Sequence, residues 1–166
     1  MFLNLIKNFF LKKNKRKKSP QINNTTNEIA FIINKQSVLN LDEFKTALQK
    51  ILLQDQKAVF IYFDEFKKDI AATDSNLISA ESFNWKAQLK NQETKHLLNK
   101  SYLFCVAFSK QNLYITKIAN EINAPYKFEI TDARNDIFDV SLICSMTNNT
   151  AHLESLKKYL KSFNLI

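Results

Sequence analysis

The chain alternates between short runs that are apolar on both faces and longer stretches in which apolar residues recur every three or four positions. Continuous apolar runs bounded by polar residues are typical of strands buried on both sides, as in a parallel sheet covered by helices. We therefore predict one mostly parallel sheet of roughly five strands, over residues 28–34, 57–63, 102–108, 126–130 and 137–143.

Helical periodicity fills most of the gaps between these strands. It predicts helices over residues 41–53, 91–99, 112–123 and 151–163, the last capped by Asn149 or Thr150. The polar tract 64–90 has no clear period, and we interpret it as loop with a short edge strand over 76–83. Strands that alternate with helices predict an α/β three-layer sandwich, Rossmann-like or flavodoxin-like.

The N-terminal segment has a different pattern. Residues 1–11 are apolar with polar interruptions, and the basic run KKNKRKK follows at 12–18. The apolar part is too short to span a bilayer, and a secretory signal would carry its bases before the apolar run. We predict a basic amphipathic N-terminal helix in residues 1–20, a polar linker over 21–27 and a single α/β domain over 28–166.

Charge separates the same two regions. The net charge is +8, yet the first 18 residues hold seven bases and no acid, which leaves 17 bases against 16 acids in the rest of the chain. The domain is thus nearly neutral, and a general nucleic-acid surface is not indicated there. The residues predicted to contact a membrane or another polyanion are Phe2, Leu3, Ile6, Phe10, Lys12, Lys13, Lys15, Arg16, Lys17 and Lys18.

The chain contains no glycine. Phosphate-binding loops, the dinucleotide fingerprint and the nucleophile elbow all need glycine where the backbone turns left-handed or approaches a phosphate. These sites are therefore excluded in their standard form. Positions with positive φ are expected to fall to asparagine, which tolerates that conformation better than most residues.

Cysteine and histidine give little sign of redox or metal chemistry. Cys105 and Cys144 lie inside apolar runs, which predicts buried, unbridged thiols and a reducing, cytoplasmic compartment. His96 and His152 are far apart and each lacks a nearby second ligand. We predict no metal site and no cofactor.

In open parallel sheets, ligands bind beyond the carboxyl ends of the strands. The polar residues predicted there as ligand-binding candidates are Asp64, Ser109, Asp132, Arg134, Thr147 and Asn149. The helix after the fifth strand could hold an anion with help from Arg134. Solvated loop residues are the alternative interpretation, and no catalytic residue is assigned. The lone tryptophan, Trp85, is expected to anchor its loop on the core.

A resemblance to a known family rests on the run from EIAFIIN through the Trp85 loop, on YLFCVAF and YKFEI, and on residues 134–143. In layout the whole chain resembles a domain-of-unknown-function family of short α/β proteins from Bacteroidota-type bacteria, which also begin with a lysine-rich segment. That family tends to carry glycine near the Trp85 loop and after the fourth strand, where this chain has none. The resemblance implies fold and organisation and adds no activity.

Three functions fit these observations. The first is a non-enzymatic α/β domain held by its basic segment at an anionic membrane surface, on the cytoplasmic side. The second is a small-molecule or anion-binding Rossmann-like domain, catalytic or not. The third is nucleic-acid or ribosome binding through the basic segment, because phosphate chains attract the same charges.

Overall fold

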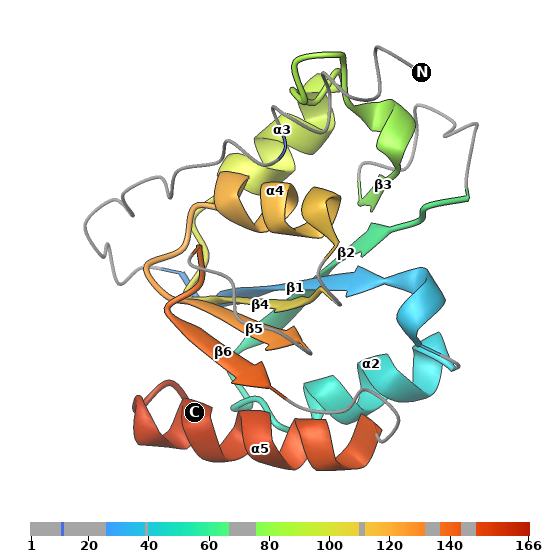
Figure 1. Cartoon of the computed structure of the whole chain (residues 1–166). Helices are drawn as coiled ribbons and strands as arrows, with labels where there is room; N and C mark the ends of the chain where they lie inside the picture. The colour runs from blue at the N-terminus through green and yellow to red at the C-terminus, as the bar shows by residue number, and fades with distance from the viewer. Residues whose placement is uncertain are drawn as a thin grey trace.

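The computed structural model describes residues 11, 26–38, 40–66, 76–109, 112–131, 137–143 and 149–166. Six parallel strands form one sheet in the order β3-β2-β1-β4-β5-β6 (Figure 1). Their bounds are Glu28–Asn34 (β1), Lys57–Phe63 (β2), Leu77–Ile78 (β3), Cys105–Phe108 (β4), Lys127–Thr131 (β5) and Val140–Ile143 (β6). The predicted parallel α/β sheet is confirmed.

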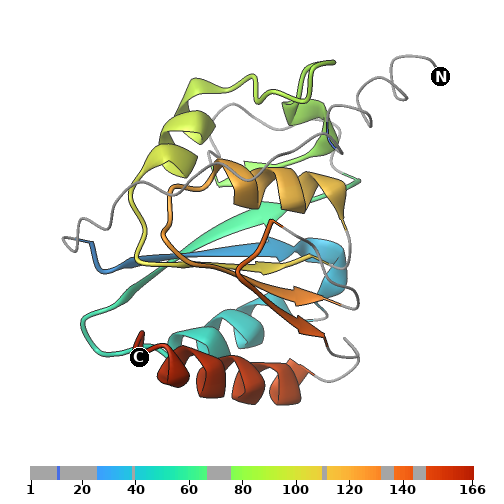
Figure 2. The same ribbon diagram turned by 60° about the vertical axis from the view of Figure 1, so that its left-hand side comes forward.

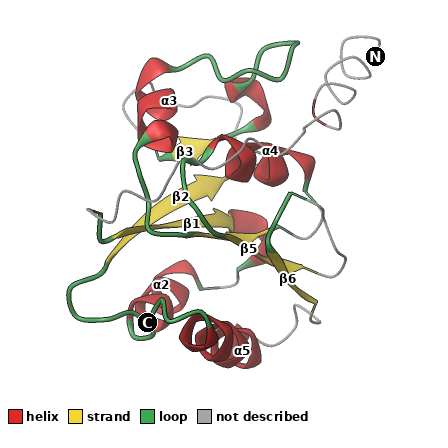
Figure 3. Ribbon diagram, turned by 90° about the vertical axis from the view of Figure 1, so that its left-hand side faces the viewer, coloured by secondary structure: helices red, strands yellow, loops and turns green. Residues whose placement is uncertain are grey.

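The described helices cover both faces of this sheet. They are α2 (Leu41–Gln49), α3 (Gln92–Asn99), α4 (Leu113–Glu121) and α5 (Asn149–Ser162), with short 3-10 turns at Lys35–Ser37 and Ala80–Ser82. Figures 2 and 3 show α3 and α4 on one face, and α2 and α5 on the other. The result is the three-layer sandwich that the alternating pattern predicts.

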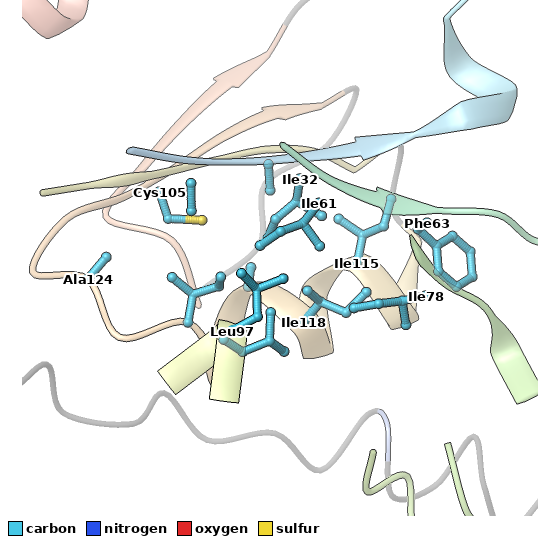
Figure 4. Packing of buried hydrophobic residues seen from close by; sticks show 14 of the residues in the cluster. Ile32, Ile61, Phe63, Ile78, Leu97, Cys105, Ile115, Ile118 and Ala124 are labelled. Atoms are coloured by element: carbon cyan, nitrogen blue, oxygen red, sulfur yellow. The ribbon is translucent and has the colours of Figure 1, made fainter. Parts of the chain in front are cut away.

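Two apolar cores fill the space between the layers. On the α3–α4 side, alternate residues of the strands, such as Ile32, Ile61 and Cys105, meet Ile115 and Ile118 of α4 (Figure 4). On the α2–α5 side, the intervening residues meet a second set, which includes Phe44, Leu48, Leu156 and Leu160. Because both faces of the central strands are buried, their sequences are continuously apolar rather than alternating.

The strand order fits both of the predicted topologies. From β1 the chain passes through α2 to β2 on one side, whereas β4 lies on the other side of β1 and is followed by α4 and β5. Counted with β3 this is the Rossmann order, and without that two-residue strand it is the flavodoxin order. In both cases the switch point lies between β1 and β4. The carboxyl ends of the strands lie at the right of the sheet in Figure 1, and we call this the carboxyl edge.

Several element boundaries differ from the sequence-based predictions. The helix predicted over 41–53 ends at Gln49, because the N–H groups of Ile51 and Leu52 bond only three residues back, to the carbonyls of Leu48 and Gln49. The apolar pattern continues to Leu52, which packs on the core as part of a turn. The last helix begins at Asn149, so this residue opens the helix instead of preceding it. The short edge strand predicted over 76–83 is present as β3, although it spans only two residues.

Candidate functional site

The carboxyl edge brings together the described ends of several strands. Asn34 closes β1, Asp64 follows β2, Ser109 follows β4 and Thr131 closes β5. Ser109 and Thr131 are fully buried and Asn34 nearly so. Of the predicted ligand-binding residues, Asp64 and Ser109 are described here. Asp132, Arg134, Thr147 and the side chain of Asn149 lie outside the described residues.

Asp64 ties the loop after β2 to the loop after β1. Its Oδ1 accepts hydrogen bonds from Gln36 Nε2 at 2.7 Å and from the Phe66 N–H at 3.1 Å. In turn, Gln36 Oε1 accepts from the Glu65 N–H at 3.4 Å. The described part of the chain holds no cluster of three metal-ligating side chains.

Ser109 belongs to a hydroxyl–carboxylate cluster with Glu129 and Ser141. The Ser109 hydroxyl donates to Glu129 Oε1 at 2.5 Å, and the Ser141 hydroxyl donates to Glu129 Oε2 at 3.3 Å. Glu129 is fully buried in β5, and the cluster joins the last three strands. A buried carboxylate needs such donors, since burial without them costs several kcal/mol.

Glu129 and Lys127 are the polar residues of this region that the sequence-based analysis did not single out. A signal for them existed, because a charged residue inside a strand buried on both faces is rare unless it has partners. Lys127 is 1% exposed, and its Nζ donates to the Ala119 carbonyl at 2.7 Å and to the Asn120 carbonyl at 3.1 Å. It therefore caps the last turn of α4, where a cation is favoured.

Burial also determines the pKa of the Cys105 thiol, which the charge of Lys127 influences. Cys105 is free and fully buried, as predicted, and Cys144 lies outside the described residues. Desolvation raises the pKa of the Cys105 thiol to about 12, and the charge of Lys127 opposes this rise only in part. A thiol held in its neutral form is neither a nucleophile nor a metal ligand at neutral pH.

Asparagine caps the helices that begin near the sheet. Asn40 accepts from the Glu43 N–H, Asn91 from those of Glu93 and Thr94, and Asn112 from those of Tyr114 and Ile115. Each of these side chains bonds to N–H groups that a bound anion would otherwise use. Three described helix N-termini are thus satisfied by the chain itself.

The Trp85 loop differs from its prediction. Trp85 is 51% exposed and carries the Lys86 ammonium over its ring at 4.8 Å, so the prediction that it anchors the loop is wrong. Phe83 and Leu89 anchor the loop instead, since both are buried and they form an antiparallel bridge. Trp85 lies between them at the tip of the loop.

The residues predicted to contact a membrane lie outside the described part of the chain. Their neighbour Leu11 is described, is helical and is 1% exposed. Among the described helices, none combines the length and the apolar character needed to cross a bilayer.

The strand order and the polar carboxyl edge define the class: a parallel α/β domain, Rossmann-like or flavodoxin-like, without a glycine-rich phosphate loop. The chain belongs to a family of unknown function, DUF6913, whose model matches residues 3–163. The expected membership in an uncharacterised family is thereby confirmed. No curated protein and no solved structure matches the chain.

Proposed function

We propose that this protein is a non-enzymatic α/β domain that binds an anionic membrane surface on its cytoplasmic side through residues 1–18. The observation that carries this proposal is the division of charge, with seven bases and no acid in that segment and a nearly neutral remainder. Near an anionic leaflet each base contributes about 1 kcal/mol, and inserted apolar side chains add to this. Seven bases therefore suffice for reversible binding.

Two further observations support membrane binding over ligand binding or catalysis at the carboxyl edge. The family match begins at residue 3, so the basic segment belongs to the region that the family model covers. The described polar groups at the carboxyl edge bond to one another, with Gln36 on Asp64 and Ser109 on Glu129. Such bonds hold loops and strands together without needing a ligand.

Sedimentation with lipid vesicles tests the proposal. We expect the protein to sediment with vesicles that contain phosphatidylserine, to stay free with phosphatidylcholine alone, and to be released by high salt. A variant with Lys12, Lys13, Lys15, Arg16, Lys17 and Lys18 replaced by Gln should lose this binding. The matched control replaces six exposed lysines of the domain by Gln, at Lys50, Lys86, Lys90, Lys100, Lys157 and Lys158.

The control variant should keep its binding, because it changes the charge by the same amount at a different place. Equal loss in both variants would reject the segment as the binding element. Salt-sensitive binding to RNA that is as tight as binding to vesicles would instead favour a nucleic-acid or ribosome partner, since phosphate chains attract the same charges.

A second candidate function is the binding of a small anion at the carboxyl edge. The strand order of the sheet favours it, because ligands of open parallel α/β folds bind where the strand order reverses. Arg134, Asp132, Thr147 and Asn149 remain the proposed contacts. Titration with inorganic phosphate, followed by thermal unfolding, should raise the melting temperature of the native chain. Arg134→Gln should abolish that rise, whereas Arg16→Gln should leave it unchanged.

A further inference from the structure

The sheet has an open edge along β2. β3 pairs with only Tyr62 and Phe63 of β2, whereas β1 pairs with β2 along all seven of its residues. Figures 1 and 3 show β3 as a short arrow near the carboxyl end of β2. Residues 57–61, which we call the open edge, therefore have a strand partner in the described chain on one side only.

The hydrogen-bond pattern shows which backbone groups face outward. The Lys57 N–H bonds to the Asn27 carbonyl on the β1 side at 2.9 Å, and the Tyr62 N–H bonds to the Asn76 carbonyl on the β3 side at 2.8 Å. In a parallel ladder these directions alternate along the strand. Within the open edge, the N–H and C=O groups of Ala58 and Phe60 therefore point away from β1.

Space for another strand exists beside these groups. A cavity of about 540 Å³ lies against the open edge, lined by Ala58, Phe60 and Tyr62 of β2 and by Thr46 and Gln49 of α2. Ala58, Val59 and Phe60 are each only partly buried. An unpaired strand flanked by a groove is the arrangement that accepts an added strand.

We propose that two copies of this chain pair through the open edge, antiparallel and around a twofold axis at Val59. The two six-stranded sheets then become one continuous sheet. In this register, Ala58 of each copy lies opposite Phe60 of the partner copy. The outward N–H and C=O groups of Ala58 and Phe60 in one copy then pair with the same groups of the partner copy. Each N–H donates to a carbonyl, and each carbonyl accepts from an N–H.

Side chains and charge favour a second copy over an unrelated peptide. Ala58 and Phe60 both pack toward the α2–α5 face, so a small side chain meets a large one on the same face. Val59 meets Val59 of the partner copy, a β-branched pair that suits a sheet. Lys57 lies opposite Ile61 of the partner copy, so the two lysines do not face each other. A twofold pair also closes on itself and leaves no free β2 edge.

Disulfide trapping tests the register. In the proposed pair the two Val59 Cα atoms are roughly 4.5 Å apart, within the range that a disulfide spans. The two Lys57 Cα atoms are roughly 13 Å apart along the strands, beyond that range. In a Cys144→Ser background, we expect Val59→Cys to form a disulfide-linked dimer at least about tenfold faster than Lys57→Cys.

Lys57→Cys is a demanding control because Lys57 is the more exposed residue, so random collision would favour it. Light scattering of the native chain should give twice its mass of 19.4 kDa. Ala58→Pro removes one outward N–H without touching the β1 ladder, and it should shift the native dimer toward monomer while circular dichroism stays unchanged. A native monomer, equal trapping at the two positions, or a dimer that Val59→Cys does not trap would each overturn the proposal.

Discussion

Positive φ angles show how a chain without glycine makes its left-handed turns. Among the described residues, Asn164 has φ 54° and Ala87 has φ 56°. Asn164 is the residue type expected there. Ala87 is not, and its turn is held by Asn84, whose Oδ1 accepts from the N–H groups of Lys86 and Gln88. An alanine in this region is less stable than a glycine by about 1 kcal/mol.

Asn164 ends α5 in a Schellman motif, which gives the first prediction. The Leu165 N–H bonds to the Leu160 carbonyl and the Asn164 N–H to the Lys161 carbonyl, each at 3.0 Å. Asn164 is exposed, so a smaller side chain leaves no cavity. We expect Asn164→Gly to stabilise the protein by about 0.5 kcal/mol, because glycine has no Cβ to disfavour this conformation. In contrast, Ser162→Gly, at the last residue of the same helix, should destabilise it by about 0.5 kcal/mol. Urea unfolding measures both, and a loss of stability in the Asn164 variant would contradict the argument.

The buried thiol gives a prediction on pH dependence. The Cys105 pKa rises from an ordinary value of 9.0 to about 12 because the thiol is desolvated. Above pH 9 the unfolded chain therefore loses a proton that the folded chain keeps, so this residue favours unfolding as the pH rises. We expect its contribution to be constant below that pH and then to fall by about 1.4 kcal/mol per pH unit up to pH 12.

Cys105→Ala should remove this slope while leaving the other titrating groups in place. The measurement is the free energy of unfolding of both proteins between pH 8 and about 10, where alkaline degradation of the protein is still slow. Parallel curves for the two proteins would show that the thiol titrates normally in the folded state.

At the scale of elements, Lys127 joins β5 to the end of α4, and this contact gives a third prediction. Lys127→Met keeps the length of the side chain but removes the donor to the carbonyls of Ala119 and Asn120. We expect a loss of about 2 kcal/mol in the free energy of unfolding, because these buried carbonyls then lack this partner. Lys117→Met is the matched control, since Lys117 bonds to Glu121 on the same helix at 2.8 Å near the surface. That change should cost about 0.5 kcal/mol. Equal losses would show that Lys127 acts only by filling space.

The strands were predictable from sequence wherever both of their faces are buried. β1 is apolar over five of its seven residues and buried over six, a pattern typical of a strand in a parallel sheet. The boundaries were less predictable, because a helix ends where its own hydrogen bonds close, as after Gln49, and not where the apolar pattern ends. β3 lies within the edge strand predicted over 76–83, but its bounds could not be predicted, since a strand of two residues has no period.

The sequence predicts which residues lie at the carboxyl edge but not which of their side chains form hydrogen bonds with one another. Because parallel strands end together, Asp64 and Ser109 could be assigned to one edge from their positions after apolar runs. Their partners are Gln36 and Glu129, which are 28 and 20 residues away in sequence. Spacing carries no information on such pairs, because they depend on the order of strands in the sheet. The strand order itself follows from the packing of the whole domain.

At the scale of the whole molecule, the burial of Leu11 bears on how the basic segment relates to the domain. Leu11 is helical and 1% exposed, and neighbours in a single helix do not cover a leucine to this extent. Other parts of the chain therefore cover Leu11. Burial would not stabilise the basic residues that follow Leu11, because burying a charge without a partner costs several kcal/mol of free energy. Leu11 thus serves packing, whereas the basic residues serve the proposed membrane binding.

Two variants separate these purposes and give the fourth prediction. Leu11→Ala should lower the free energy of unfolding by about 2 kcal/mol, because it removes a covered side chain, while binding to phosphatidylserine vesicles persists through the remaining bases. Replacing the six bases from Lys12 to Lys18 by Gln should do the opposite, with vesicle binding lost and stability changed by less than about 0.5 kcal/mol. Thermal unfolding and vesicle sedimentation measure the two effects on the same samples. If Leu11→Ala abolished vesicle binding and left stability unchanged, Leu11 would contact the membrane and not the protein.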